Sequence, residues 1–131
     1  MDFEAKIAEL GLLIPKPAKP AGSYKPCVIV DNFAYISGQG PLLEDGSFAK
    51  GKVGADVDLE TAQNHAKLCG LAILSALKNE IGSINKVDQL IKLTGFVNCI
   101  ESFTQQPLVI NGCSNMMKDI FGENGVHARA A

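Results

Sequence analysis

The segment 58–82 has the pattern that most constrains the fold. Asp58 is a favourable N-cap residue, and Val57 and Ala62 are spaced to form a hydrophobic staple across a first helical turn. Gly82 supplies a C-terminal stop. The apolar positions at helical spacing are mostly small: Ala62, Ala66, Cys69, Ala72 or Ile73, Ala76 and Leu77. Because small side chains let a helix approach its neighbour closely, we expect one long helix lying against a β-sheet.

Strand patterns flank this helix on both sides. Two β-rich runs, 27–30 and 33–37, are separated by an Asp-Asn pair and predict a hairpin, and a short edge strand is expected at 51–54. The segment 87–100 alternates apolar and polar residues and predicts the clearest strand. Its apolar face is expected to hold Ile91, Leu93, Val97 and Cys99.

A second amphipathic helix is expected from Pro107, which suits a first helical turn, to the stop at Gly122. Its apolar positions are Val109, Ile110, Met116, Met117, Ile120 and Phe121. Another strand begins after it, so the elements run helix, strands, helix, strand, helix, strand. The simplest arrangement is two β-α-β units, and we predict an α+β fold with a mixed sheet and two main helices on one face.

The N-terminal residues 1–22 are expected to add a short helix and a strap. Asp2 can cap a helix that places Phe3, Ile7 and Leu10 on one face and ends at Gly11. The proline-rich stretch 14–20 that follows is expected to be extended, because each proline disfavours helical geometry in the residue before it. With 131 residues, the chain is expected to form one domain over 1–131.

Charge and cysteine usage narrow the class of function. The net charge of −2 argues against a nucleic-acid grip, and the lysines at 16, 19 and 25 are interpreted as a solvated segment. The four cysteines have no paired metal-ligand spacing, so we expect reduced thiols in a cytoplasmic protein, with no metal and no cofactor. There is no apolar run of the length that a membrane span needs.

Five residues are candidates for a binding site, each with a simpler alternative. Ser37 and Gly38 follow a strand, where glycine lets a ligand approach the backbone, but the same residues suit an ordinary turn. Arg129 stands among alanines and could bind a planar carboxylate, or lie exposed, or pair with an acid. Asn111 could orient a ligand or satisfy a loop, and Tyr24 could donate its hydroxyl into a cleft or pack with its tip in solvent.

The two histidines do not form a recognisable nucleophilic pair with a serine or cysteine at local spacing. His65 is interpreted as a solvated residue in the middle of the long helix. His127 points the same way as Arg129 only if the last strand is regular.

Several of these segments together resemble the Rid family of reactive-intermediate imine deaminases, also called YjgF-like or L-PSP-type proteins. The matching segments are 22–24 (Gly-Ser-Tyr), 32–41 (ending Ser-Gly-Gln-Gly-Pro), 46–54, 87–98, Asn111 and 127–129 (His-Ala-Arg). The resemblance covers residues 20–131. The additional N-terminal helix and the segments 81–82 and 106–112 are typical of a longer-chain branch.

The resemblance implies a chorismate-mutase-like fold, a homotrimer with a barrel-like core, and ligand sites in clefts between subunits. The implied activity is hydrolysis of small 2-imino acids, such as 2-iminobutanoate, to 2-keto acids and ammonia. Carried over by motif, Arg129 would hold the substrate carboxylate, and the backbone at Ser37 and Gly38 would contact the imine. Tyr24 and Asn111 would shape the cleft, Tyr24 from the neighbouring subunit.

Three departures from the family pattern bear on activity. Ser23 replaces the usual proline, Ala131 stands where many active members have cysteine, and the family continues through two more strands, one with a glutamate implicated in handling water. We therefore expect C-terminal strands to be missing from these 131 residues. Binding of a small carboxylate metabolite without turnover is the alternative function. RNA cleavage, a label that the family also has, ranks third because of the acidic balance and the lack of a histidine-centred acid–base pair.

Overall fold

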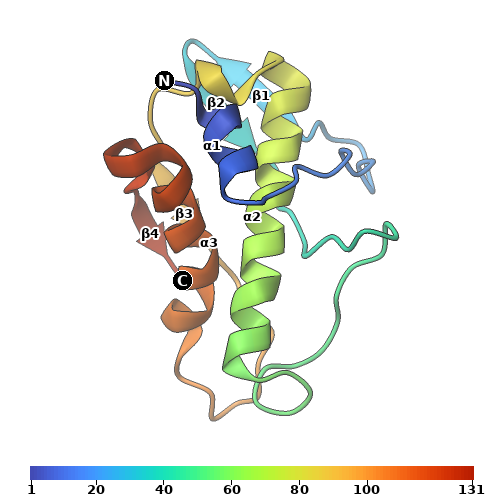
Figure 1. Cartoon of the computed structure of the whole chain (residues 1–131). Helices are drawn as coiled ribbons and strands as arrows, with labels where there is room; N and C mark the ends of the chain where they lie inside the picture. Colours follow the sequence, from blue (N-terminus) through green and yellow to red (C-terminus); the bar gives the residue numbers. More distant parts are fainter.

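The computed structural model describes all 131 residues and is organised around helix α2, Leu59–Ile81 (Figure 1). The Asp58 carboxylate accepts a hydrogen bond from the Thr61 backbone N–H at 2.8 Å, and Gly82 ends the helix with a φ of 90°. The predicted helix is therefore confirmed. Its buried surface is wider than the predicted stripe, because Gly70, Leu71, Leu74 and Ser75 are also buried, while Cys69 and Ile73 are only partly buried.

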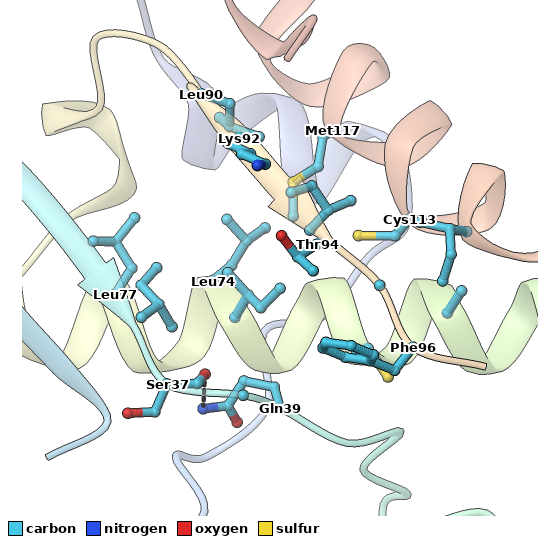
Figure 2. Close-up of a pocket in the computed structure, with 18 of the residues that line it drawn as sticks. Ser37, Gln39, Leu74, Leu77, Leu90, Lys92, Thr94, Phe96, Cys113 and Met117 are labelled. Atoms are coloured by element: carbon cyan, nitrogen blue, oxygen red, sulfur yellow. Dashed lines mark hydrogen bonds between the residues drawn. The ribbon is translucent and has the colours of Figure 1, made fainter. Parts of the chain in front are cut away.

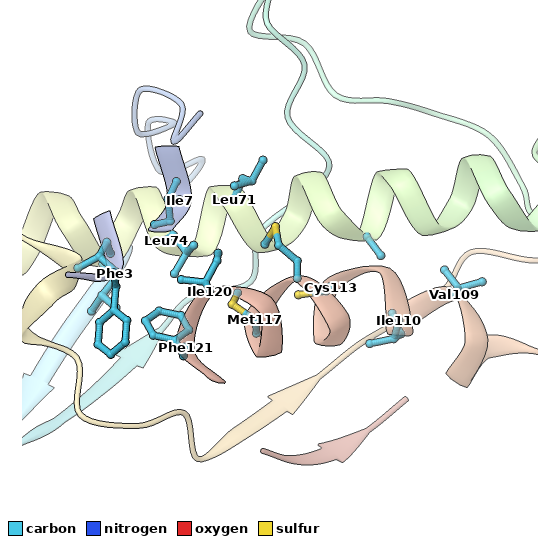
Figure 3. Close-up of a cluster of buried hydrophobic side chains, with 14 of the residues drawn as sticks. Phe3, Ile7, Leu71, Leu74, Val109, Ile110, Cys113, Met117, Ile120 and Phe121 are labelled. Carbon is cyan, nitrogen blue, oxygen red and sulfur yellow. The ribbon is translucent and has the colours of Figure 1, made fainter. Parts of the chain in front are cut away.

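Helix α3, Gln106–Phe121, packs along α2 and contributes much of the core (Figure 3). Pro107 lies in its first turn and Gly122 is its C-cap, as predicted. The two helices approach closely where Gly112 meets the Gln63 backbone, and the Gln63 side chain donates to the Leu108 carbonyl at 2.8 Å. The buried face of α3 comprises Val109, Ile110, Cys113, Met116, Met117, Ile120 and Phe121.

Helix α1, Phe3–Glu9, closes the end of this core. Asp2 caps it by accepting from the Ala5 N–H at 2.9 Å, and the Phe3 ring meets Phe121 edge-on with centroids 4.8 Å apart. Leu10 is 38% exposed, so its predicted place on the buried face is wrong. The helix ends at Glu9, and Leu10 follows as the C-cap residue outside the apolar face.

Glu4 connects α1 to the C-terminal end of α2 through hydrogen bonds. Its carboxylate accepts hydrogen bonds from Lys78 Nζ at 2.5 Å, Ser83 Oγ at 2.5 Å and the Ile84 N–H at 3.2 Å. Ile84 begins the 3-10 turn η1, Ile84–Lys86, and is fully buried. The hydrogen bond from Lys78, followed by that from Ser83, lowers the pKa of Glu4 from its ordinary value of 4.5.

We expect Glu4→Gln to lower the free energy of unfolding at neutral pH by about 1 kcal/mol, since bonds to a partly exposed charge are lost. Because the pKa of Glu4 is lower in the folded state, its carboxylate stabilises the fold above pH 4.5. That contribution is lost as the pH falls through the folded-state pKa. Urea unfolding at neutral and acid pH should show the difference from wild type shrinking, while Glu9→Gln, which removes only an exposed 3.8 Å pair with Lys6, should change little at either pH.

Four short strands form two separate sheets. Strands β1, Cys27–Val30, and β2, Phe33–Ile36, make the predicted antiparallel hairpin, with Asp31 at a φ of 54° in its turn. Strand β3, Lys92–Thr94, pairs in parallel with β4, Ala128–Ala130, after the 3-10 turn η2, Gly122–Gly125. The single mixed sheet that the sequence predicted is not formed within this chain.

The prediction of one strand over 87–100 is correct for only three residues. The backbone hydrogen bonds to β4 begin at the Ile91 carbonyl, which accepts from the Ala128 N–H, and end at the Gly95 N–H, which donates to the Ala130 carbonyl. Ile91 itself is 55% exposed. Beyond this, Cys99 pairs with Val53 through an isolated parallel bridge, and Val53 makes a second such bridge with Val57. The edge strand expected at 51–54 is therefore reduced to single bridges at Val53. The alternation itself places Leu93, Val97 and Cys99 against the core, as predicted. Alternation therefore identified the buried face but not the number of residues that find a strand partner.

An apolar groove of about 1600 Å³ separates the two sheets. Leu74 and Leu77 of α2 lie along it between Ser37, at the end of β2, and the β3 segment with Lys92 and Thr94 (Figure 2). Many large apolar side chains are also exposed on the hairpin and near β3: Val28, Ile29, Val30, Phe33, Tyr35, Ile91 and Phe96. No helix has the length and apolarity required to cross a membrane.

Candidate anion-binding site

Arg129 is held on the surface between strand β4 and helix α3. It is the middle residue of β4 and lies opposite Leu93 of β3. Its Nη1 donates to Asn111 Oδ1 at 2.7 Å and to Ser114 Oγ at 3.1 Å, and its Nη2 donates to the Pro107 carbonyl at 3.1 Å. The guanidinium of the only arginine in the chain is therefore fixed by three groups of one helix.

His127, the residue before β4, joins the same cluster. Its Nε2 lies 2.9 Å from Ser114 Oγ and its Nδ1 lies 2.7 Å from the Gly125 carbonyl. His127 and Arg129 are two residues apart on the strand segment, so both face α3. Their shared partner, Ser114, shows that the two side chains point the same way, which is the case that a regular strand requires.

The hydrogen bonds within the chain leave part of the guanidinium available. Three of the five N–H groups of Arg129 are used, and those on Nε and one on Nη2 have no partner within the chain. Nε and Nη2 are adjacent, so together they can donate two hydrogen bonds to one carboxylate. No acid is within ion-pair distance of Arg129, so the alternative of a salt bridge is not realised.

Ser37 and Gly38 lie elsewhere, at the edge of the apolar groove. The Ser37 hydroxyl donates to the Lys25 carbonyl at 2.6 Å and its N–H to the Pro26 carbonyl at 2.9 Å, so both fasten the end of the hairpin. The Gly38 backbone makes no hydrogen bond within the chain, and a Cβ placed on Gly38 would meet nothing within 4 Å. Gly38 thus offers open backbone groups, while Ser37 supports them.

Tyr24 occupies a third place, in the loop before β1. Its hydroxyl accepts a hydrogen bond from the Ala21 N–H at 3.2 Å, and the residue is 51% exposed. Within one chain, the structure therefore brings Asn111 and Arg129 together but leaves Tyr24, Ser37 and Gly38 apart from them. The groove that Ser37 and Gly38 line does not include Arg129 or Asn111.

Two partners of Arg129 were missed by sequence reasoning. Ser114 follows Asn111 by three residues, which places both side chains on one face of α3, and this spacing could have identified it. The Pro107 carbonyl had no such signal, because any backbone carbonyl in a first helical turn looks alike in the sequence. No group of three or more histidine, cysteine, aspartate or glutamate residues is arranged to hold a metal ion.

Comparison with known proteins identifies the family. Residues 4–131 match the family described as "YjgF/chorismate_mutase-like, putative endoribonuclease". The chain belongs to this YjgF-like family. The YjgF-like fold is a mixed α+β arrangement, here with three helices and two small sheets.

One related sequence and two related crystal structures show how similar this YjgF-like chain is to known proteins. Protein TCP17 of Trypanosoma cruzi is 35% identical over 128 residues, covering 97% of this chain and 80% of TCP17. The crystal structure of Atu1372 from Agrobacterium tumefaciens, described as having unknown function, is 43% identical with a TM-score of 0.87, over 98% of this chain and 78% of Atu1372. A crystal structure described as a "putative endoribonuclease" from Shewanella oneidensis MR-1 is 30% identical with a TM-score of 0.95, over 99% and 86% of the two chains.

Proposed function

We propose that this YjgF-like protein hydrolyses small 2-imino acids to 2-keto acids and ammonia. The observation that supports this most is the Arg129 guanidinium, which is fixed by Asn111, Ser114 and the Pro107 carbonyl while two adjacent nitrogens remain able to bind a carboxylate. A 2-imino acid places its carboxylate directly beside the reacting carbon. Anchoring the carboxylate therefore also positions the imine, and positioning alone can supply much of the rate gain.

The reaction needs only water as a second reactant. Water adds to the carbon of the protonated imine, and one proton of the added water moves to the amine nitrogen. The carbinolamine then expels ammonia, which takes up the remaining hydroxyl proton as ammonium and leaves the keto acid. In the proposed site, Arg129 holds the carboxylate, and the open backbone at Gly38 accepts a hydrogen bond from the iminium N–H. Tyr24 and Asn111 shape the cleft around the substrate.

We propose that the site is completed between subunits of a homotrimer with a barrel-like core. Two observations support assembly. Gly38 and Tyr24 do not reach Arg129 within one chain, and large apolar side chains of the β1–β2 hairpin are exposed. A neighbouring copy would cover the apolar hairpin and bring the separated groups to one cleft.

The contiguous core, which draws on all three helices, supports one domain over 1–131. The four free cysteines support a cytoplasmic location.

Binding of a small carboxylate without turnover is the alternative. It is favoured by the chemistry around Arg129, where the partners are an amide, a hydroxyl and a carbonyl, none of which is a strong base. RNA cleavage is a further candidate because the family description and the Shewanella structure both refer to an endoribonuclease. The net charge of −2 is unfavourable for gripping a phosphate backbone.

The test is hydrolysis of 2-iminobutanoate, generated in place by threonine dehydratase and followed in competition with semicarbazide. We expect faster release of 2-ketobutanoate with the protein present, and saturable binding of 2-ketobutanoate by calorimetry. Size-exclusion chromatography with light scattering checks the trimer in the same sample. Binding without acceleration by a confirmed trimer would support the binding alternative, and cleavage of single-stranded RNA with no effect on the imine would overturn the proposal.

A further inference from the structure

Ser114 and His127 form a hydrogen-bonded chain that ends on Arg129. The chain runs from the Gly125 carbonyl through the His127 ring to the Ser114 hydroxyl and then to Arg129 Nη1. Both Ser114 and His127 are only partly exposed. Neither residue is needed for helix capping or for the apolar core, so their arrangement calls for another explanation.

The direction of each hydrogen bond follows from chemistry. A carbonyl oxygen only accepts, so the proton of neutral His127 lies on Nδ1 and is donated to the Gly125 carbonyl at 2.7 Å. His127 Nε2 is then an acceptor, and it takes the Ser114 hydroxyl hydrogen at 2.9 Å. With its hydrogen directed at His127, Ser114 Oγ presents its lone pairs to Arg129 Nη1. The backbone carbonyl of Gly125 thus determines how the serine faces the arginine.

We infer that Ser114 and His127 are positioning residues, which orient the Arg129 guanidinium for the carboxylate of its ligand; this rests on the proposed function. Nη1 donates to both Asn111 Oδ1 and Ser114 Oγ, with nitrogen–oxygen distances of 2.7 and 3.1 Å. Nη1 is therefore withdrawn from ligand binding, and the carboxylate is directed to the side formed by Nε and Nη2. Ser114 and His127 act through Arg129 and do not touch the substrate.

Ser114→Ala is expected to raise the dissociation constant of 2-ketobutanoate and the KM of imine hydrolysis by about tenfold, with kcat changed less than about twofold, because one bond to a charged donor is lost. Ser114→Thr keeps the hydroxyl and should restore both values. His127→Phe should resemble Ser114→Ala, whereas His127→Gln, which offers an amide oxygen near the position of Nε2, should retain tighter binding than His127→Phe. Asn115→Ala, at the exposed neighbour of Ser114, is the matched control.

A second readout does not depend on any ligand. Because Arg129 is the only arginine, its guanidinium gives one set of side-chain signals in nitrogen-15 NMR spectra. We expect slow rotation and slow proton exchange at Nη1 in the wild type, and faster values in Ser114→Ala and His127→Phe but not in Asn115→Ala. Circular dichroism confirms that each variant is folded.

The outcomes separate this inference from the proposed function. Unchanged Nη1 dynamics in a folded Ser114→Ala variant would overturn the positioning role, whether or not 2-ketobutanoate binds. Loss of binding in Arg129→Ala with wild-type binding in Ser114→Ala would also overturn it and leave the proposed function standing. Perturbed Nη1 dynamics in a protein that neither binds the keto acid nor hydrolyses the imine would contradict the proposed function and support only the orientation of Arg129.

Discussion

Replacing Arg129 with alanine is expected to weaken binding of 2-ketobutanoate by about 100-fold or more, because a bidentate bond to a carboxylate combines charge with two directed hydrogen bonds. Arg129→Lys retains the charge but not the fork, and it also loses the bonds to Asn111 and Ser114. We therefore expect the lysine variant to bind at least about tenfold more weakly than the wild type, which is a loss of about 1.4 kcal/mol or more of binding free energy.

Titration calorimetry on the three proteins measures this effect, with imine hydrolysis as the second assay. Lys118→Ala is the charge-matched control, since Lys118 is an exposed cation on helix α3, the helix that holds Arg129. Equal weakening by Arg129→Ala and Lys118→Ala would mean that general electrostatic attraction, and not an anchored carboxylate, accounts for binding. Retained affinity in Arg129→Ala would remove the basis of the proposed site.

Gly112→Ala is expected to destabilise the fold by about 3 kcal/mol, despite the higher helix propensity of alanine. A Cβ at position 112 would overlap the Gln63 carbonyl group of α2, and backbone cannot move aside without separating the two helices. The neighbouring Asn111 would shift with it, so ligand binding should weaken in parallel.

Gly70→Ala provides a matched comparison on the opposing helix. Its new Cβ would meet Met116 Cε at 2.6 Å and Cys113 Sγ at 2.8 Å, and the methionine end can rotate away. Cys113 Sγ, on a short buried side chain, must also shift, so we expect a net loss of about 1 kcal/mol after the gain in helix propensity. Urea unfolding of both variants decides the matter. A Gly112→Ala protein as stable as Gly70→Ala would show that the helix pair can separate at little cost.

Much of the fold follows from local signals that the structure bears out. Asp58 and Gly82 mark the ends of α2 through the hydrogen bond and backbone angle that such residues favour. In α3, Pro107 lies in the first turn, where a missing N–H costs nothing, and Gly122 ends the helix with a φ of 64°. These signals succeed because capping is decided by a few neighbouring atoms.

The remaining features depend on long-range pairing, which a local pattern does not contain. The segment around β3 has the alternation of a long strand, yet only Lys92–Thr94 pair with β4, and the two sheets stay apart across the groove. The same holds for the site. Asn111 and Arg129 were identified from the family motif and are in contact in the structure. Ser114 was not identified, although its spacing from Asn111 places it on the same face of α3, because only the packing of β4 against α3 shows that this face meets Arg129.

The thiols of Cys69 on α2 and Cys113 on α3 can report on the separation of these two helices. Burial raises the pKa of Cys113 to about 12, with the nearby Cys69 adding to the rise and Arg129 opposing it, and burial raises the pKa of Cys69 to about 11. Thiolate is the reactive form, so both residues are nearly inert to alkylating reagents while the helices are together. A substitution that loosens the contacts of Arg129 with α3 should increase the rate at which an alkylating reagent modifies Cys113. A carboxylate bound to Arg129 should decrease that rate.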